Sequence, residues 1–350
     1  MKKFLVGIAL LLLIFSPVLA QEAGTQLPKL QGITVQNANQ IEQIGILGRD
    51  TSNDKNLSDD EIIIAVASSY ISDFVFSFDA SKLAWISGND IYITDFDTGK
   101  TILLPSAAYE TVRLAFSPDN QFLGSTNGDT VQLWDVNQGL ELKKTDTGIY
   151  GVSPSSLNFS ADGKQLIGTA GNKAYSWDTS EESPSQIELK NRDFADDIIL
   201  GSTRDTIFTE YLNKTVKLWN IETGENTFSF DADVRLVIES PNKQTIFVVN
   251  NDGGGQLWGL EDHTYHVLAQ IPKMDTVISS AAFNLDASLL AMMTEDGMVY
   301  LWDTATEQVI SSFKTGHTNY VMKVEFSPDS NVLATSSQDG TVRLWGVPAN

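Results

Sequence analysis

The chain has 350 residues, and its 23 lysines and arginines stand against 45 aspartates and glutamates, giving a formal net charge of -22. Such an anionic surface repels phosphate and has few cations with which to release counterions, so nucleic acid is excluded as an expected partner. The chain contains no cysteine. Disulfides, thiolate metal ligands and cysteine nucleophiles are therefore excluded as well.

The N-terminus, MKKFLVGIALLLLIFSPVLA, has the pattern of a bacterial-type secretory signal peptide. Two lysines precede an apolar run of 12 residues from Phe4 to Phe15, which is too short to span a bilayer comfortably. Small residues lead to Ala20, so we expect a signal peptide over residues 1–20 that is cleaved after Ala20. The alternative is an uncleaved anchor. Export predicts a secreted, periplasmic or cell-envelope protein of net charge -24 (21 basic minus 45 acidic residues) that does not insert into the membrane.

After an N-terminal extension over residues 21–40, the stretch NQIEQIGILGRD predicts a single strand near Ile41 to Leu47. An acidic loop, DTSNDKNLSDDE, follows it. Oxygen-bearing side chains occupy the ligand positions of a twelve-residue calcium loop at Asp50, Ser52, Asp54, Asn56, Ser58 and Glu61. Lys55 stands where such a loop needs glycine, and a strand rather than a helix precedes it. No cofactor or metal is therefore expected; calcium in this loop is the alternative to a solvated acidic insertion.

A repeat runs through the rest of the chain. The segments IYITD, VQLWD, AYSWD, VKLWN, GQLWG, VYLWD and VRLWG recur every 39 to 44 residues and share one equivalent position. That position is occupied by Thr94, Trp134, Trp177, Trp219, Trp258, Trp302 and Trp345. A period of this size is typical of propellers and other repeat architectures.

A second mark precedes most of these positions by 18 or 19 residues, as in FSPDN from Phe116 and FSPDS from Phe326. Proline presets a turn dihedral, and aspartate, asparagine and glycine close tight turns. Short apolar runs alternate with such turns between the two marks. Each repeat is therefore predicted to be several short antiparallel strands joined by hairpins.

The recurring tryptophan, often followed by aspartate, and the preceding turn resemble the WD-repeat family of β-propellers. The resemblance implies an all-β, seven-bladed propeller over residues 41–350, with four antiparallel strands, a to d, in each blade. Trp345 would lie on strand c of the last blade, which leaves that blade without a strand d. We therefore predict that Ile41 to Leu47 supplies this strand, closes the ring and removes both open edges.

The family also uses a buried hydrogen-bonded set of tryptophan, serine or threonine, histidine and aspartate. Only the last repeat matches it, with His317, Ser337 or its neighbour Ser336, Asp339 and Trp345. We interpret this set as structural rather than as a catalytic Ser-His-Asp triad.

Catalytic signatures are lacking in the sequence, which has no glycine-rich phosphate loop, G-x-S-x-G elbow or H-E-x-x-H motif. His263 and His266 are two of the three histidines. Their spacing sends them to opposite faces of a strand, so a zinc site there is disfavoured against a solvated hairpin. The sequence therefore predicts no enzyme.

Two functions are compatible with these features. The first is a secreted, monomeric platform for a protein partner, and the family resemblance implies the protein interaction. The second is an exported enzyme or carbohydrate binder that uses the central channel. The resemblance also places the d-to-a and b-to-c loops on one face, where Tyr70, Tyr109 and Tyr320 would form an aromatic patch on neighbouring blades, with Asn319 in its polar rim. The alternative is that each ring packs against its own loop.

Overall fold

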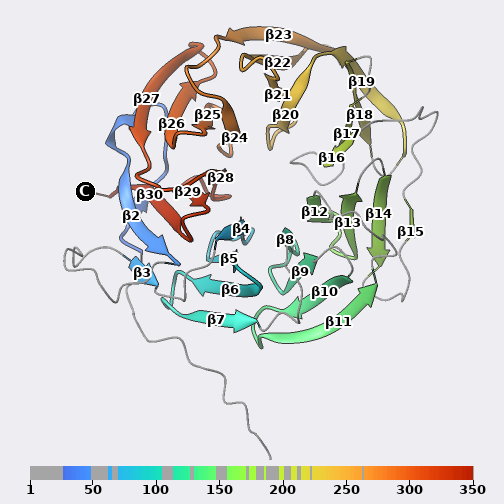
Figure 1. The fold of residues 1–350 in the computed structure, drawn as a ribbon, viewed down its shortest axis with the longest axis vertical. Coiled ribbons are helices and arrows are strands. Elements are labelled where there is room, and N and C mark those ends of the chain that lie inside the picture. Colours follow the sequence, from blue (N-terminus) through green and yellow to red (C-terminus); the bar gives the residue numbers. More distant parts are fainter. Residues whose placement is uncertain are drawn as a thin grey trace, which may run out of the picture.

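The computed structural model describes residues 27–48, 62–64, 70–104, 113–126, 130–146, 156–170, 173–178, 185–186, 197–200, 206–210, 214–220, 223–261 and 264–349. Figure 1 shows their strands arranged in a ring of seven sheets around a central opening. The expected signal peptide, the acidic loop with its calcium pattern, Tyr109 and His263 lie outside the described residues. Among the described residues, no helix has the length and hydropathy that a membrane span requires.

Six blades have four antiparallel strands each, as predicted. The first contains β4 (Ile71–Phe76), β5 (Lys82–Ser87), β6 (Asp90–Asp95) and β7 (Thr101–Leu104). The second contains β8 (Arg113–Phe116), β9 (Phe122–Thr126), β10 (Thr130–Asp135) and β11 (Leu140–Asp146). The third contains β12 (Ser156–Phe159), β13 (Gln165–Ala170), β14 (Lys173–Asp178) and β15 (Ser185–Gln186).

The fourth blade contains β16 (Asp197–Leu200), β17 (Thr206–Glu210), β18 (Thr215–Asn220) and β19 (Asn226–Asp231). The fifth contains β20 (Val234–Glu239), β21 (Thr245–Asn250), β22 (Gly255–Glu261) and β23 (Thr264–Ile271). The sixth contains β24 (Ile278–Phe283), β25 (Leu289–Thr294), β26 (Met298–Asp303) and β27 (Gln308–Lys314). In each blade the first strand lies innermost in the ring (Figure 1).

The seventh blade joins the two ends of the described chain. Strands β28 (Val321–Phe326), β29 (Val332–Ser337) and β30 (Val342–Pro348) are completed by β2 (Glu42–Leu47), which pairs antiparallel with β30 (Figure 1). Gln43 lies opposite Trp345 in this ladder. The predicted closure is therefore confirmed, and it leaves β30 paired on both sides instead of presenting an open edge.

The N-terminal segment extends this closure further than the repeat pattern predicts. Strand β3 (Ile62–Ile64) adds to β2 in parallel, and β1 (Leu30–Gln31) pairs with the end of β30. A short 3-10 helix, η1 (Ala38–Gln40), lies between β1 and β2. Ile33 and Ala38 are each 1% exposed and pack in one cluster with Leu301 of the sixth blade and Val347 of the seventh. Residues 27–40 thus contribute to the core between the last two blades.

The hydrophobic core lies between neighbouring blades, because each sheet buries both faces. One cluster joins the seventh and first blades through Leu344, Phe74 and Trp85. The next joins the first and second blades through Ile93, Phe116 and Trp134. Blade stacking therefore fixes the ring, and the turns at the strand ends form its two outer faces.

Candidate functional site

The buried histidine set of the seventh blade is present, with one correction. His317 Nδ1 lies 3.0 Å from Asp339 Oδ2, and His317 Nε2 lies 3.0 Å from Thr335 Oγ1. Trp345 Nε1 donates to the same Thr335 oxygen at 3.1 Å. The hydroxyl member is therefore Thr335, and the prediction of Ser337 is wrong.

Strand geometry explains the correction. Trp345 pairs with Leu333, and Thr335 lies two residues further along β29, so its side chain points to the same face. Ser336 points to the opposite face, and its buried Oγ has no hydrogen-bond partner among the described residues. Ser337 lies at the turn, where its hydroxyl donates to Asn319 O at 3.1 Å and accepts from the Asp339 amide at 3.0 Å.

This set is built for stability rather than catalysis. The side chain of His317 is 0% exposed, and both ring nitrogens are already hydrogen-bonded. Burial raises the pKa of Asp339, but hydrogen bonds from His317 and Thr341 outweigh it and hold that pKa well below its usual value. Asp339 also accepts the amide of Thr318 at 3.0 Å, which ties the d-to-a loop to the blade. A substrate has no route to the hydroxyl of Thr335, which is itself 0% exposed.

The same geometry recurs in other blades without histidine. Trp134 Nε1 donates to Ser125 at 2.9 Å, and Trp219 Nε1 donates to Thr209 at 2.8 Å. In each case the acceptor lies two residues beyond the strand b residue that pairs with the tryptophan. The residue on strand b that lies two positions beyond the tryptophan's partner therefore decides whether the indole nitrogen has a hydrogen-bond acceptor.

In the first blade the tryptophan and the hydroxyl residue exchange positions. Thr94 occupies the usual tryptophan position, and Trp85 occupies the usual hydroxyl position on the adjacent strand. Trp85 Nε1 donates to Thr94 Oγ1 at 3.2 Å, and both side chains are buried. The threonine that interrupts the tryptophan series and the one tryptophan outside that series therefore form the same bond in reverse.

Three blades lack the hydroxyl altogether. The equivalent positions are Gly168, Val248 and Met292. Among the described residues, the buried indole nitrogens of Trp177, Trp258 and Trp302 have no hydrogen-bond partner. These blades depend on apolar packing alone at this point.

The predicted aromatic patch is exposed where the structure describes it. Tyr320 is 65% exposed and Tyr70 is 38% exposed, and the adjacent Met322 is 40% exposed. Tyr320 O accepts the amide of Gln338 at 2.8 Å, so the ring projects from an anchored loop. Asn319 is partly committed to that loop, because its Oδ1 accepts the Tyr320 amide at 2.8 Å.

An ion-paired seam lies between the innermost strands of the seventh and first blades. Lys323 Nζ lies 3.2 Å from Asp73 Oδ1 and 2.8 Å from Glu325 Oε2, and it donates to Phe74 O at 2.6 Å. Asp73 Oδ2 in turn accepts the amide of Leu114 in the second blade at 3.1 Å. Burial lowers the pKa of Lys323, but the adjoining carboxylates outweigh it and raise that pKa.

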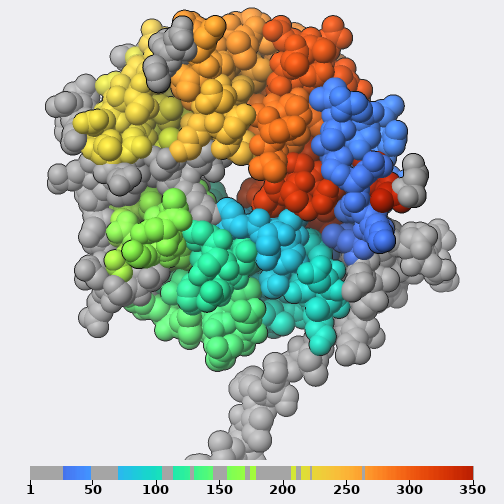
Figure 2. All heavy atoms as spheres, turned by 180° about the vertical axis from the view of Figure 1, so that it is seen from behind, coloured from blue at the N-terminus to red at the C-terminus, as the bar shows by residue number. Residues whose placement is uncertain are grey.

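The seam is a structural contact between the seventh and first blades. Figure 2 shows the opening that runs through the middle of the ring, next to these inner strands. A channel enzyme would need carboxylates free for acid and base work. Here Asp73 and Glu325 already share one lysine, and their side chains are only 9% and 27% exposed.

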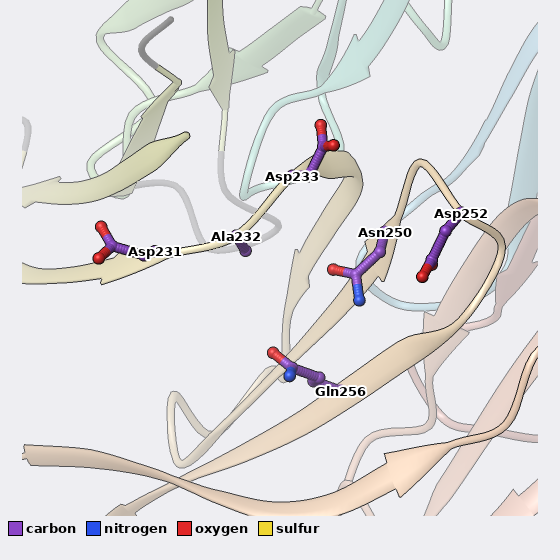
Figure 3. A pocket seen from close by; sticks show the side chains of 6 residues that line it. All are labelled: Asp231, Ala232, Asp233, Asn250, Asp252 and Gln256. Carbon is purple, nitrogen blue, oxygen red and sulfur yellow. The ribbon is translucent and has the colours of Figure 1, made fainter. Parts of the chain in front are cut away.

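A shallow hollow of about 220 Å³ lies at the fourth and fifth blades (Figure 3). It is lined by Asp231, Ala232, Asp233, Asn250, Asp252 and Gln256. Its volume is below the range of roughly 300–1,000 Å³ that is usual for ligand sites. Its carboxylates also have partners: Asp233 pairs with Lys214 at 2.7 Å, and Asp231 accepts Thr215 Oγ1 at 3.1 Å. The hollow is therefore small, and its carboxylates already have partners within the protein.

Zinc at the two histidines, which the sequence disfavours, and calcium in the acidic loop remain alternatives to the expected absence of a metal. His266 lies on β23 opposite Gly259, while His263 lies outside the described residues. Within the parts of the chain that the structure describes, no group of three or more histidines, aspartates or glutamates is arranged to hold a metal ion.

Comparison with known proteins agrees with this architecture. Residues 307–346 match the family model described as WD domain, G-beta repeat. The chain is 25% identical over 218 residues to the target of rapamycin complex subunit LST8 of Bos taurus, which covers 56% of this chain and 63% of that protein. It is 24% identical over 191 residues to autophagy-related protein 16 of Arabidopsis thaliana, covering 53% of this chain and 36% of that protein.

A third relative is the COMPASS component SWD3 of Saccharomyces cerevisiae, 24% identical over 210 residues, with 57% of this chain and 66% of that protein covered. The chain thus spans less than two thirds of the length of each of these relatives. Among solved structures, the Cps50 (Swd1) β-propeller domain of Myceliophteria thermophila superposes with a TM-score of 0.69 at 14% identity, covering 81% of this chain and 98% of that domain. The chain is a seven-bladed β-propeller, and its residues 307–346, which extend from the outer strand of the sixth blade through the seventh blade, match a WD-repeat model.

Proposed function

We propose that this chain is an exported, non-catalytic scaffold that binds a protein partner on the face formed by its d-to-a and b-to-c loops. The observation that carries the proposal is the exposure of Tyr320, which is 65% exposed on a loop whose backbone is held in place. An aromatic ring presented rigidly loses little entropy on binding and buries a large area, which is why tyrosine is enriched at binding hot spots.

The neighbouring residues support this placement. Tyr70 holds the equivalent position in the first blade, where its carbonyl accepts the amide of Gly88 at 3.2 Å, as that of Tyr320 accepts Gln338. The inner strands of these two blades are joined by the seam of Lys323 and Asp73. Both aromatic residues therefore stand on one rigid part of the ring. The relatives named above include two subunits of larger complexes, LST8 and SWD3, and a protein partner is the corresponding expectation here.

The test is capture of the partner from the envelope of the producing cell with the mature chain, followed by mass spectrometry and a binding titration with the captured protein. Tyr320→Ala should weaken binding by about 1–3 kcal/mol, or roughly 5- to 150-fold. Val309→Ala is the matched control, because Val309 is 43% exposed on the outer edge of the sixth blade. Equal weakening by both variants, or lower melting with unchanged binding for Tyr320→Ala, contradicts the proposal.

Export is tested separately by N-terminal sequencing of the protein recovered from the envelope and the medium. The expected mature sequence begins at Gln21. A chain that begins at Met1 in the membrane fraction would indicate the uncleaved anchor.

A further inference from the structure

The turns between strands a and b form a second surface, on the face opposite the exposed tyrosines. Six described turns share one fold, in which the first side chain hydrogen-bonds within the turn: Ser77, Ser117, Ser160, Ser240, Asn284 and Ser327. In five of these turns the first residue is a serine whose hydroxyl donates a hydrogen bond to the side chain two residues later, at 2.6–2.7 Å. The residue between these two is thus held in a fixed position.

That fixed position carries an apolar residue in every one of the six turns. All six turns lie in successive blades, from the fifth through the sixth, seventh, first and second to the third (Figure 1). The fifth-blade turn has Asn242 and Lys243 after its apolar Pro241, whereas an aspartate follows the apolar residue in the other five. We define the turn arc as Leu285, Pro328, Phe78, Pro118 and Ala161. Leu285 is 57% exposed and Phe78 is 44% exposed, although side chains of this size are usually buried.

Contacts join three of the four neighbouring pairs of turns along the arc. The amide of Leu285 donates to Ser330 Oγ in the next blade at 2.9 Å, and the amide of Phe78 donates to Asn120 Oδ1 in the next blade at 2.6 Å. Pro118 lies against Gly163 of the third blade, where a Cβ would stand 3.2 Å from its ring. These contacts join the turn of the sixth blade to that of the seventh, and the turn of the first blade to those of the second and third, while the seam of Lys323 and Asp73 joins the seventh and first blades.

Carboxylates surround the arc. The residue directly after each arc position is an aspartate, namely Asp286, Asp329, Asp79, Asp119 and Asp162, and all five are exposed. The side-chain hydrogen bond from Ser117 lowers the pKa of Asp119, and that from Ser160 lowers the pKa of Asp162. In the six described turns the cations are Lys82, which pairs with Asp95 at 2.8 Å, Lys164, which pairs with Asp162 at 3.5 Å, and Lys243. The apolar arc thus has an anionic border.

We infer that the turn arc is a docking surface for a polypeptide segment that carries an apolar side chain between lysines or arginines. The apolar residue would pack between Phe78 and Leu285 over the intervening Pro328, and the flanking cations would meet the aspartates beside them. An acidic segment would meet like charges instead, so the border selects against it. This inference is independent of the tyrosine face.

The test uses fluorescence anisotropy with a labelled hexapeptide probe: two lysines, phenylalanine, leucine and two lysines. A second probe has glutamates in place of the lysines. The cationic probe should bind the whole chain, and the double variant Phe78→Ser, Leu285→Ser should bind it at least about tenfold more weakly. The anionic probe should not bind measurably.

Two control variants locate the site. Leu103→Ser removes a residue of similar exposure, 39%, from strand β7 at the outer edge of the first blade, and Tyr320→Ala alters the opposite face. Both should keep the affinity for the cationic probe within about twofold. A loss of binding with Tyr320→Ala alone would move the peptide site to the tyrosine face.

Three results would overturn the inference. The first is unchanged affinity of the double variant, which would leave only diffuse attraction to the anionic surface. The second is equal binding of the two probes. The third is a dimer in sedimentation that the double variant abolishes, because the arc would then be covered by a second copy of the chain. A melting scan of each variant checks that it is folded.

Discussion

The indole hydrogen bond that four of the seven blades contain can be tested by moving it from one blade to another. Thr209 accepts the indole of Trp219 at 2.8 Å in the fourth blade, whereas Val248 occupies the same position beside Trp258 in the fifth. Thr209 and Val248 are each 0% exposed. Threonine and valine have nearly the same shape, so Thr209→Val removes the acceptor and Val248→Thr supplies one with little change in packing.

The expected changes have opposite signs. Thr209→Val leaves a buried donor unsatisfied, a loss of about 1–3 kcal/mol, which the added methyl group offsets in part. We expect a net loss of about 1–2 kcal/mol in the free energy of unfolding. Val248→Thr pairs the Trp258 nitrogen, which now lacks a partner among the described residues. The new bond is worth about 1 kcal/mol and has to exceed the cost of burying the hydroxyl, so we expect a gain of up to about 1 kcal/mol.

Differential scanning calorimetry of the mature chain measures both changes. For a domain of this size about 1 kcal/mol corresponds to roughly 2 °C in Tm. Trp219→Phe provides the control, because it removes the donor, and adding Thr209→Val should then cost much less than it does alone. If Val248→Thr lowers Tm as much as Thr209→Val does, the position rather than the hydrogen bond decides stability, and the reasoning is refuted.

Three further predictions follow from individual contacts. Hydrogen bonds depress the pKa of Asp339, so its contribution to the free energy of unfolding is complete above the unfolded pKa near 3.9 and is lost as pH falls below that value. Asp339→Asn should therefore lower Tm at pH 7 and flatten the fall in Tm between about pH 4 and 2. Deleting Gln21 to Gly48 exposes the edge of β30 and should make the protein aggregate, whereas a variant that stays monomeric with unchanged melting contradicts the closure. Ala80 has a φ of 58°, in the left-handed region that Gly163 also occupies at the same turn position. Ala80→Gly should therefore raise the free energy of unfolding, measured by calorimetry, by about 0.5–1 kcal/mol. A decrease would show that the methyl group of Ala80 packs better than expected.

The sequence by itself determined the number of blades and the way the ring closes. Both are local and periodic features: a tryptophan, replaced by Thr94 in the first blade, marks one strand of each blade every 39 to 44 residues, and a lone apolar stretch near Ile41 supplies the strand that the last blade lacks. Hydrogen bonding requires that unpaired edges be covered, so the missing strand could be located without a structure. The face on which Tyr320 lies was also predictable from its loop position in the repeat, whereas the exposure of its ring was decided by the structure.

Contacts between strands and blades were decided only by the tertiary structure. The choice of Thr335 over Ser337 depends on the pairing of Leu333 with Trp345, and adjacent hydroxyl residues in a sequence do not reveal that register. The same register explains why Trp85 and Thr94 exchange roles.

Contacts between blades depend on how the sheets stack, which no periodic pattern encodes. Lys323 meets Asp73 across 250 residues of sequence, and Leu285 meets Ser330 of the next blade. The turn motif predicted a tight turn at Leu285 and another at Ser330, and stacking of the blades brought these two turns together. A repeat sequence therefore specifies its unit and its count, whereas the seam and the turn arc arise from the packing of one unit against the next.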